Sequence, residues 1–181
     1  MIDNINDETV CAVAHHEAAH VVIACDLELA IGKKGAVVYG HPPDPTGSAY
    51  FEGATSGTPV EASKEESVVI ALLAGGIAHN RFTDRTERAV LSDQQRVAEL
   101  MGAPSFSSPE VQERILPLSA KAAQLVDQHW SEIVKVGTAL LKKEWQYRNR
   151  HVGFFKEKSL SGEELQNLLS PMTVVVDDTI E

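Results

Sequence analysis

Apolar residues fill most of the segment from residue 6 to residue 28, without the strict alternation of a half-buried strand. Asn6 stands at its start as a candidate N-cap. Asp7 and Glu8 follow, where acidic side chains favour the positive end of a helix dipole. The pattern predicts a largely buried helix over residues 6–28.

Two short β-like runs follow this helix. Residues 35–40 and 48–52 are rich in small, β-branched and aromatic residues, and the segment between them is dense in proline and glycine. This arrangement predicts a hairpin or a pair of edge strands. An edge strand can hold an extended peptide through backbone hydrogen bonds, although a plain structural hairpin fits the pattern equally well.

Helical spacing and capping signals predict four more helical segments. Their expected ranges are 59–82, 93–102, 109–150 and 162–169. The N-caps expected for the first, second and last are Thr58, Ser92 and Ser161. Pro117 is expected to break the third segment, because proline removes a helical hydrogen bond. Gly75 and Gly76 lie inside the first, where they are expected to allow a close helix–helix contact.

The composition narrows the classes of function. An apolar fraction of 43% suffices for a core, while a formal charge of −10 and a pI near 5.1 argue against a nucleic-acid partner. No apolar run approaches the roughly 18–20 residues of a membrane span, and the acidic start differs from a signal peptide, so a cytoplasmic protein is expected. Cys11 and Cys25 would lie about 21 Å apart on one helix, too far for a disulfide, and are expected to be small apolar residues.

Within the first predicted helix, His16, Glu17 and His20 form the pattern H-E-x-x-H. Residues four apart on a helix share one face, so the two imidazoles can bind the same Zn²⁺. Glu17 is placed to take a proton from a zinc-bound water rather than to bind the metal. The motif predicts a zinc hydrolase, a class in which peptidases are the most frequent members.

A catalytic zinc usually has a third protein ligand. The candidates are Asp26, Glu61, Glu65, Glu66 and Asp93. Asp26 has the spacing of one peptidase class, but Ile23 replaces the glycine that would turn the chain back. The three glutamates suit a solvated helix start equally well. Asp93 is expected in the first turn of a helix after an apolar triplet. The pattern fits a metal ligand and an ordinary acidic residue at a helix start equally well.

Several segments resemble the peptidase domain of the FtsH-type ATP-dependent metalloproteases. Residues 16–22 match the family's H-E-A-G-H segment and the apolar run after it, and residues 72–78 are similar to its L-x-G-G-R-A-A-E segment. Residues 89–94 resemble the G-A-x-x-D-L context of its aspartate ligand, and residues 130–165 match in character. The resemblance implies a mainly α-helical, zincin-like domain in which Asp93 is the third zinc ligand.

The chain also departs from that family. Ala19 replaces a glycine, Gln94 replaces a leucine, and His79 and Asn80 stand where the family has acidic residues. The chain contains neither a G-x-x-x-x-G-K-[ST] phosphate loop nor a membrane segment. The resemblance therefore implies a peptidase domain without its ATPase, which accepts unfolded chains, peptides or material from a separate ATPase or adaptor. The family forms hexameric rings, so the resemblance is compatible with a homo-oligomer.

Together these features predict one peptidase domain over residues 1–170, with a metal-binding part (1–104), a C-terminal helical bundle (105–170) and a tail (171–181) that is frayed or adds a strand. The expected activity is zinc-dependent hydrolysis of peptide bonds, with Glu17 as general base. A non-catalytic, zinc-containing module that binds peptides or proteins is the alternative, and a metal-free helical protein with an accidental motif is a third hypothesis. The candidate oxyanion donors are His15, Tyr39, Tyr50 and His79.

Overall fold

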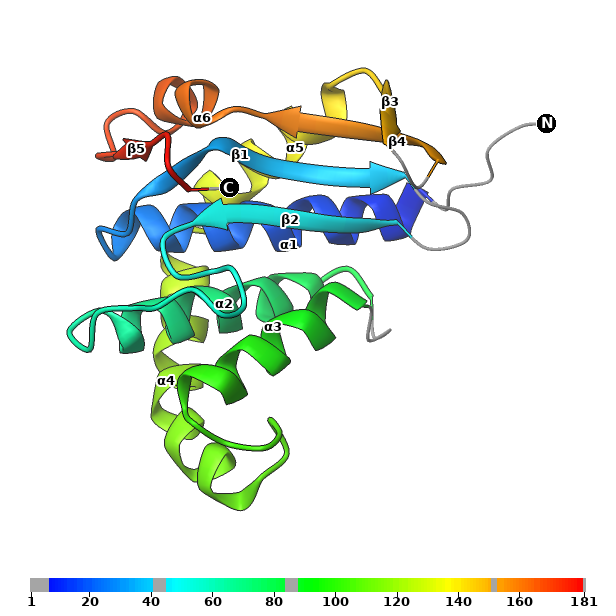
Figure 1. Cartoon of the computed structure of the whole chain (residues 1–181). Helices are drawn as coiled ribbons and strands as arrows, with labels where there is room; N and C mark the ends of the chain where they lie inside the picture. The colour runs from blue at the N-terminus through cyan, green and yellow to red at the C-terminus, as the bar shows by residue number, and fades with distance from the viewer. Residues whose placement is uncertain (1–6, 41–44, 84–87, 151–152, 181) are drawn as a thin grey trace.

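The structure is a computed structural model that describes residues 7–40, 45–83, 88–150 and 153–180. The helices in these residues are α1 (Asp7–Asp26), α2 (Glu65–His79), α3 (Arg88–Leu100), α4 (Pro109–Gln128), α5 (Trp130–Lys142) and α6 (Gly162–Leu169). The strands are β1 (Ile31–Gly40), β2 (Thr46–Phe51), β3 (Gln146–Arg150), β4 (Gly153–Leu160) and β5 (Val176–Asp177). The described chain is therefore mainly helical with one small sheet, as the sequence predicts (Figure 1).

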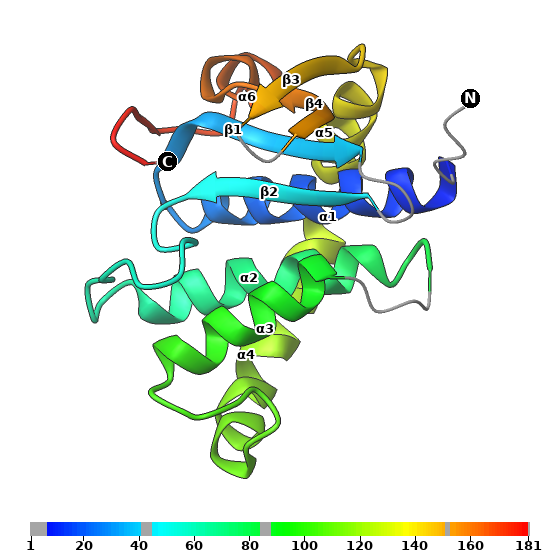
Figure 2. The same ribbon diagram turned by 45° about the vertical axis from the view of Figure 1, so that its right-hand side comes forward.

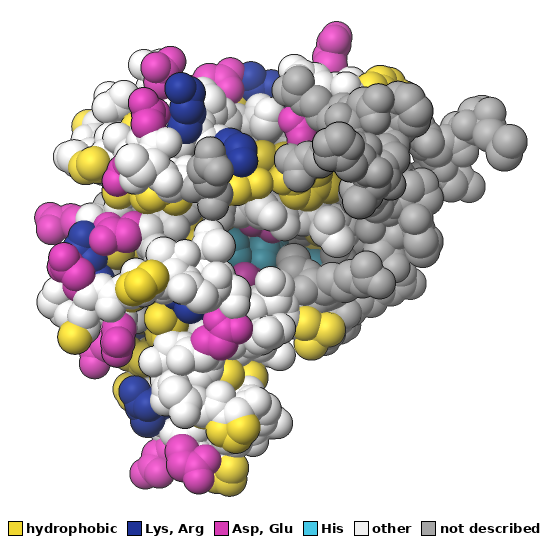
Figure 3. Space-filling view, viewed as in Figure 1, with side chains coloured by type: hydrophobic (Ala, Val, Ile, Leu, Met, Phe, Trp, Pro, Cys, Tyr) yellow, Lys and Arg dark blue, Asp and Glu magenta, His cyan; other side chains and the backbone are white. Residues whose placement is uncertain are grey.

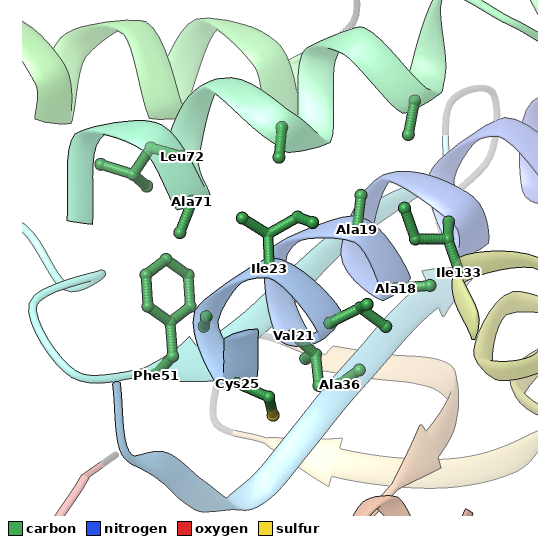
Figure 4. Packing of buried hydrophobic residues seen from close by; sticks show 14 of the residues in the cluster. Ala18, Ala19, Val21, Ile23, Cys25, Ala36, Phe51, Ala71, Leu72 and Ile133 are labelled. Carbon is green, nitrogen blue, oxygen red and sulfur yellow. The ribbon is translucent and has the colours of Figure 1, made fainter. Parts of the chain in front are cut away.

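Helix α1 lies at the centre of the molecule and packs against β1, β2, α2 and α5. Every residue from Ala12 to Cys25 is at most 6% exposed, which confirms the predicted buried helix. Small side chains allow the neighbouring elements to approach closely. Ala18 lies toward Ile133 of α5, and Ala19 faces α2 (Figure 4). Because α1 is covered on all sides, it has no polar face of the usual kind.

The sheet has the strand order β2-β1-β4-β3, and neighbouring strands in this order are antiparallel. Strands β1 and β2 form the antiparallel pair that the sequence predicts, with Val38 opposite Gly47. The tail adds the short strand β5, which pairs in parallel with the start of β1 at Ile31. Strand β2 ends the sheet, so one of its edges has no strand partner in the described part of the chain (Figure 2).

The prediction of helix up to about residue 150 is wrong. Helix α5 ends at Lys142, and Lys143 adopts an extended conformation (φ −62°, ψ 145°) that leads into β3 and β4. Strand β4 pairs with β1, where Ala36 lies opposite Leu160. Pairing with this distant strand outweighs the local helical pattern. The C-terminal part is therefore not a helical bundle alone, because it supplies two strands to the sheet.

The predicted break at Pro117 is also wrong, because α4 runs through this residue. Its buried face consists of Val111, Ile115, Ala122, Leu125 and Val126. Packing of this face on both sides of the proline offsets the lost hydrogen bond. The chain turns instead at His129 (φ −104°, ψ 21°), whose Nε2 lies 3.0 Å from Asp26 Oδ1 at the end of α1.

Helix α2 begins later than predicted. Its first residue is Glu65, and the N-cap residue Lys64 makes no side-chain capping hydrogen bond. Thr58 does not cap a helix, because residues 55–58 form a turn and the Thr58 carbonyl accepts a hydrogen bond from Arg96 Nη2 at 2.7 Å. A contact with another helix thus keeps this segment in a loop.

Helix α3 begins earlier than predicted, at Arg88, so Ser92 is not its N-cap. Val90 faces α2, where its Cγ1 would be 3.7 Å from a Cβ placed on Gly76. This packing explains why the helix includes the residues before Ser92.

The capping box predicted for α6 is confirmed. Ser161 Oγ accepts a hydrogen bond from the backbone N–H of Glu164 at 3.2 Å, and Glu164 Oε2 accepts one from the Ser161 N–H at 2.9 Å. These two bonds satisfy N–H groups that a helix start leaves unpaired.

The two cysteines are free, and Cys25 is buried, in agreement with the sequence analysis. Of the helices in the described residues, none has the length and apolarity that crossing a membrane requires.

We expect Ile133→Ala to lower the free energy of unfolding by about 2–5 kcal/mol, because it leaves a cavity between α5 and α1. The matched control is Leu116→Ala on α4, where the side chain is 73% exposed and a change within about 0.5 kcal/mol is expected. Urea denaturation followed by circular dichroism measures both. Equal losses in the two variants would contradict the central position of α1.

Candidate metal centre

Three potential ligand atoms converge beside α1. The Nε2 atoms of His16 and His20 lie 2.9 Å apart, and Asp93 Oδ2 lies 2.9 Å from the first and 3.2 Å from the second. The two histidines come from one face of α1, as their spacing predicts. Asp93 comes from the second turn of α3 rather than from its first, so it reaches the histidines from the side of the helix.

The chemistry of this triangle fits a metal ion. His20 Nδ1 donates a hydrogen bond to the Ala71 carbonyl at 2.8 Å, because a carbonyl can only accept. When the ring is neutral, this hydrogen bond places the lone pair on Nε2, which points toward His16 and Asp93. Zinc–nitrogen bonds of 2.0–2.1 Å in tetrahedral geometry would place ligand atoms about 3.3 Å apart, close to the separations in this triangle.

His16 is held differently from His20. Its Nδ1 is buried and has no hydrogen-bond partner among the described residues. Its ring is instead enclosed by edge-on contacts, with ring centroids 4.5 Å from His20 and 5.8 Å from His79. Packing of the ring and the contacts at Nε2, rather than a hydrogen bond at Nδ1, orient this imidazole.

Gly75 of α2 lies directly against the ligand nitrogens. A Cβ at this position would be 2.4 Å from His20 Nε2 and 2.9 Å from His16 Nε2. Both separations are too short for real atoms, so only glycine leaves the triangle open. The close helix contact expected from the sequence therefore forms at Gly75, where it also shapes the metal centre.

Glu17 lies beside the triangle and is 2% exposed. One ring nitrogen from each of His16 and His20 and one carboxylate oxygen of Glu17 all lie within 4.8 Å of one another. On its other side, Glu17 touches strand β2: a Cβ at Gly47 would be 2.2 Å from Glu17 Oε1. Strand β2 thus passes within contact distance of the carboxyl group that the motif assigns as the base.

The electrostatics of the centre follow from its burial. Burial raises the pKa of the Glu17 carboxyl to about 8, although the charge of His20 opposes this rise. Burial alone would lower the pKa of His20, but the Asp93 and Glu17 carboxylates outweigh it and raise the value to about 9. Burial and the neighbouring His20 lower the pKa of His16. Burial opposes ionisation of Asp93, yet the two histidines hold its pKa well below the usual range. In the metal-free protein, protons would occupy the place of a cation.

A pocket of about 200 Å³ opens onto these residues. Its described lining is His16, Glu17, His20, Gly47, Ser48, Ala49, Tyr50, Phe51, Ala54, Thr55, Ser56, Leu72, Ser92 and Asp93. Figure 3 shows histidine and acidic side chains at the bottom of a hollow between the upper and lower parts of the molecule. One wall is the backbone of β2, the strand with an edge that has no strand partner among the described residues.

The other candidate ligands lie elsewhere. Asp26 is exposed at the end of α1 and contacts His129. Glu65 and Glu66 line a separate pocket with Arg114, and Glu61 is exposed in the segment before α2. None of these four acids lines the pocket at the histidines.

The four candidate oxyanion donors do not lie together at the pocket. Tyr50 lines the pocket, and its hydroxyl lies 2.9 Å from that of Tyr39. His79 is buried beside His16 rather than in the pocket. His15 faces the opposite way, where its Nδ1 donates to the Cys11 carbonyl at 2.8 Å and its ring packs on α5 residues. Only Tyr50 of these four is positioned to face a ligand.

Two site residues escaped the sequence analysis. Gly47 was assigned to a turn-rich connection, and Gly75 to helix packing. Glycine inside a helix or a strand is a signal of close backbone approach, but the sequence does not say what approaches.

A scan of the chain against models of protein families finds no match, and a search of curated proteins finds none either. The resemblance to FtsH-type peptidase domains therefore rests on the quoted residues alone.

We expect Gly75→Ala to weaken zinc binding at least about tenfold, because the new methyl group displaces the His20 ring. Gly76→Ala is the matched control: its Cβ meets nothing closer than Val90 at 3.7 Å, so zinc affinity should stay within about threefold. Competition with a chromogenic chelator measures both affinities. Equal affinities in the two variants would mean that Gly75 does not shape the centre.

The raised pKa of Glu17 predicts a pH dependence of the metal-free protein. Because the folded state binds this proton more tightly than the unfolded chain, the stability that the proton supplies is lost as pH rises from about 5 through 8. The side chain introduced by Glu17→Gln cannot ionise. The free energy of unfolding of this variant should therefore increasingly exceed that of the wild type over this window, by on the order of a few kcal/mol. Urea denaturation with a chelator present, at several pH values, measures the difference. Parallel pH curves would show that Glu17 titrates normally.

Proposed function

We propose that this protein is a zinc-dependent metallopeptidase that hydrolyses peptide bonds in unfolded chains or peptides. One observation carries the proposal: the atoms of His16, His20 and Asp93 converge at 2.9–3.2 Å beside the buried Glu17. The pocket at this point borders the edge of a strand.

The donor set supports zinc as the metal. Two imidazole nitrogens and one carboxylate oxygen match the ligand types of catalytic zinc sites, in which three protein ligands leave a further position for water. A magnesium or calcium site would use oxygen ligands instead. The open pocket on one side of the triangle is where such a further ligand fits.

Glu17 supplies the proton chemistry in this proposal. When bound, zinc lowers the pKa of a coordinated water and polarises the scissile carbonyl. Glu17 accepts a proton from the attacking water and donates it to the departing amine. Burial raises the pKa of this carboxyl in the metal-free protein, and a raised pKa makes the carboxylate a stronger proton acceptor.

Strand β2 supports an extended substrate. Its backbone passes Glu17 at Gly47, and its edge has no strand partner among the described residues. A peptide could add to this edge through backbone hydrogen bonds, so that its scissile bond lies near the centre. Extended backbone is available in unfolded chains and flexible peptides. We also propose that a separate ATPase or adaptor delivers such chains and that the protein forms a homo-oligomer.

We expect Glu17→Gln to keep bound zinc and to lower kcat by roughly 10²–10⁴-fold on a fluorescently labelled unfolded protein, because it removes the base. Asp93→Ala should lose zinc affinity by about a hundredfold or more, because only two protein ligands remain. Chelator competition and a release assay for labelled peptides measure the two effects.

Full activity in Glu17→Gln would overturn the mechanism. If the wild type binds zinc and an unfolded peptide but cleaves nothing, the non-catalytic binding module is the correct interpretation. If it binds no zinc, the metal-free hypothesis is correct.

A further inference from the structure

Residues 53–58 connect β2 to the segment before α2, and we call them the cleft loop. Ala54, Thr55 and Ser56 of this loop line the pocket that opens onto the metal centre. The loop follows β2 directly, so the same backbone runs from the strand edge into this wall. A peptide paired with β2 would therefore meet the cleft loop at one end.

Arg96 holds both ends of the cleft loop. Its Nε donates to the Gly53 carbonyl at 3.0 Å, and its Nη2 donates to the Thr58 carbonyl at 2.7 Å. Its Nη1 lies 3.4 Å from Glu99 Oε2. The residue is only 6% exposed, although arginine is normally a surface residue. The planar guanidinium has donors in several directions, which lets one side chain span two carbonyls five residues apart.

The middle of the cleft loop is attached to the same helix. Ser56 Oγ lies 2.7 Å and 2.6 Å from the two carboxylate oxygens of Glu99. At its start, Gly53 adopts a left-handed conformation (φ 81°), and a Cβ there would lie 2.8 Å from Val60 and Val68. The loop is thus fixed at its start, middle and end.

Helix α3 carries both Arg96 and the candidate ligand Asp93, one turn apart. Arg96 itself does not line the pocket and does not contact the metal ligands in the described structure. Any influence of Arg96 on a substrate must therefore pass through the cleft loop. The buried guanidinium of Arg96 would lower stability if it had no partners, so its contacts with the cleft loop and Glu99 help to stabilise the fold.

We propose that Arg96 is a positioning residue for the substrate, because it fixes the cleft loop as the end wall of the groove along β2. This assignment rests on the proposed peptidase function, and it adds a residue that sets how tightly the peptide is held. It assigns peptide binding and the chemistry at Glu17 to different groups, because the Arg96 guanidinium contacts the cleft loop whereas the Asp93 carboxylate contacts the histidines.

The test compares zinc-loaded Arg96→Gln with the wild type and with Glu99→Gln. In Arg96→Gln, hydrogen exchange of the amides in residues 54–58 should accelerate, and KM for an unfolded peptide should rise roughly tenfold while kcat stays within about twofold. Glu99→Gln still accepts the Ser56 hydroxyl and keeps Arg96 in place, so its KM should change about threefold or less. Arg96→Lys should recover KM only in part, because one ammonium cannot span both carbonyls.

Three outcomes would overturn the assignment. Unchanged exchange in residues 54–58 would show that Arg96 does not fix the loop, and unchanged KM with fast exchange would show that the loop does not hold substrate. A fall in kcat and zinc affinity at constant KM would mean that Arg96 acts on Asp93 instead. Where Arg96→Gln does not fold, Arg96→Lys carries the same measurements.

The failure of the proposed function has a different signature. In that case the wild type cleaves no peptide, and, unless the protein is the non-catalytic binding module, zinc-loaded Glu17→Gln binds no peptide either. The substrate role of Arg96 then falls with it. If the wild type cleaves peptide and the Arg96 variants behave as the wild type does, the peptidase function stands and only the assignment of Arg96 is wrong.

Discussion

Helix α1 brings two imidazoles and a carboxyl group into the interior, where each is at most 2% exposed. Polar groups in such a position lower stability unless partners satisfy them. The structure supplies these partners from outside α1: the Ala71 carbonyl accepts a hydrogen bond from His20 Nδ1, and Asp93 faces both Nε2 atoms. The remaining lone pairs, on the two Nε2 atoms and on Asp93 Oδ2, converge on one point. Protons or a cation must occupy this point to offset their mutual repulsion. The burial of these side chains is thus the constraint around which the other elements are arranged.

Two glycines allow that arrangement from opposite sides. Gly75 lets the backbone of α2 reach the ligand nitrogens, and Gly47 lets the backbone of β2 reach Glu17. At each contact a single methyl group would displace a functional side chain. The centre is therefore enclosed by backbone rather than by side chains, which leaves one side open toward the edge of β2. Enclosure of this kind excludes water from Glu17 and raises its pKa, while the backbone of a second chain could still approach.

The sequence predicted those features that depend on local periodicity. The buried helix, the β1–β2 pair and the capping box at Ser161 are confirmed because each depends on residues close together in the chain. The strands β3 and β4 were missed, because β4 is stabilised by pairing with β1, more than a hundred residues earlier, and β3 by pairing with β4. The start of α2 was misplaced for a similar reason, since a distant arginine holds Thr58 in a loop. At the metal centre, the H-E-x-x-H spacing was enough to place three side chains together. The residue pattern alone left Asp93 among several acids, the family resemblance singled it out, and the packing of α3 places it beside the histidines.

The candidate third ligand comes from an element unlike the helix that carries the two histidines. Helix α3 lies on the outside of the molecule, and the Asp93 side chain is 20% exposed. The helix packs mainly on α2 and β2, and the Asp93 side chain reaches the two histidines of α1. A metal held by His16, His20 and Asp93 would therefore join an outer helix to the central one, and part of its binding free energy would stabilise the position of α3. The same helix holds the cleft loop through Arg96. If a metal and a peptide bind here as proposed, α3 would supply Asp93 to the metal and Arg96 to the cleft loop.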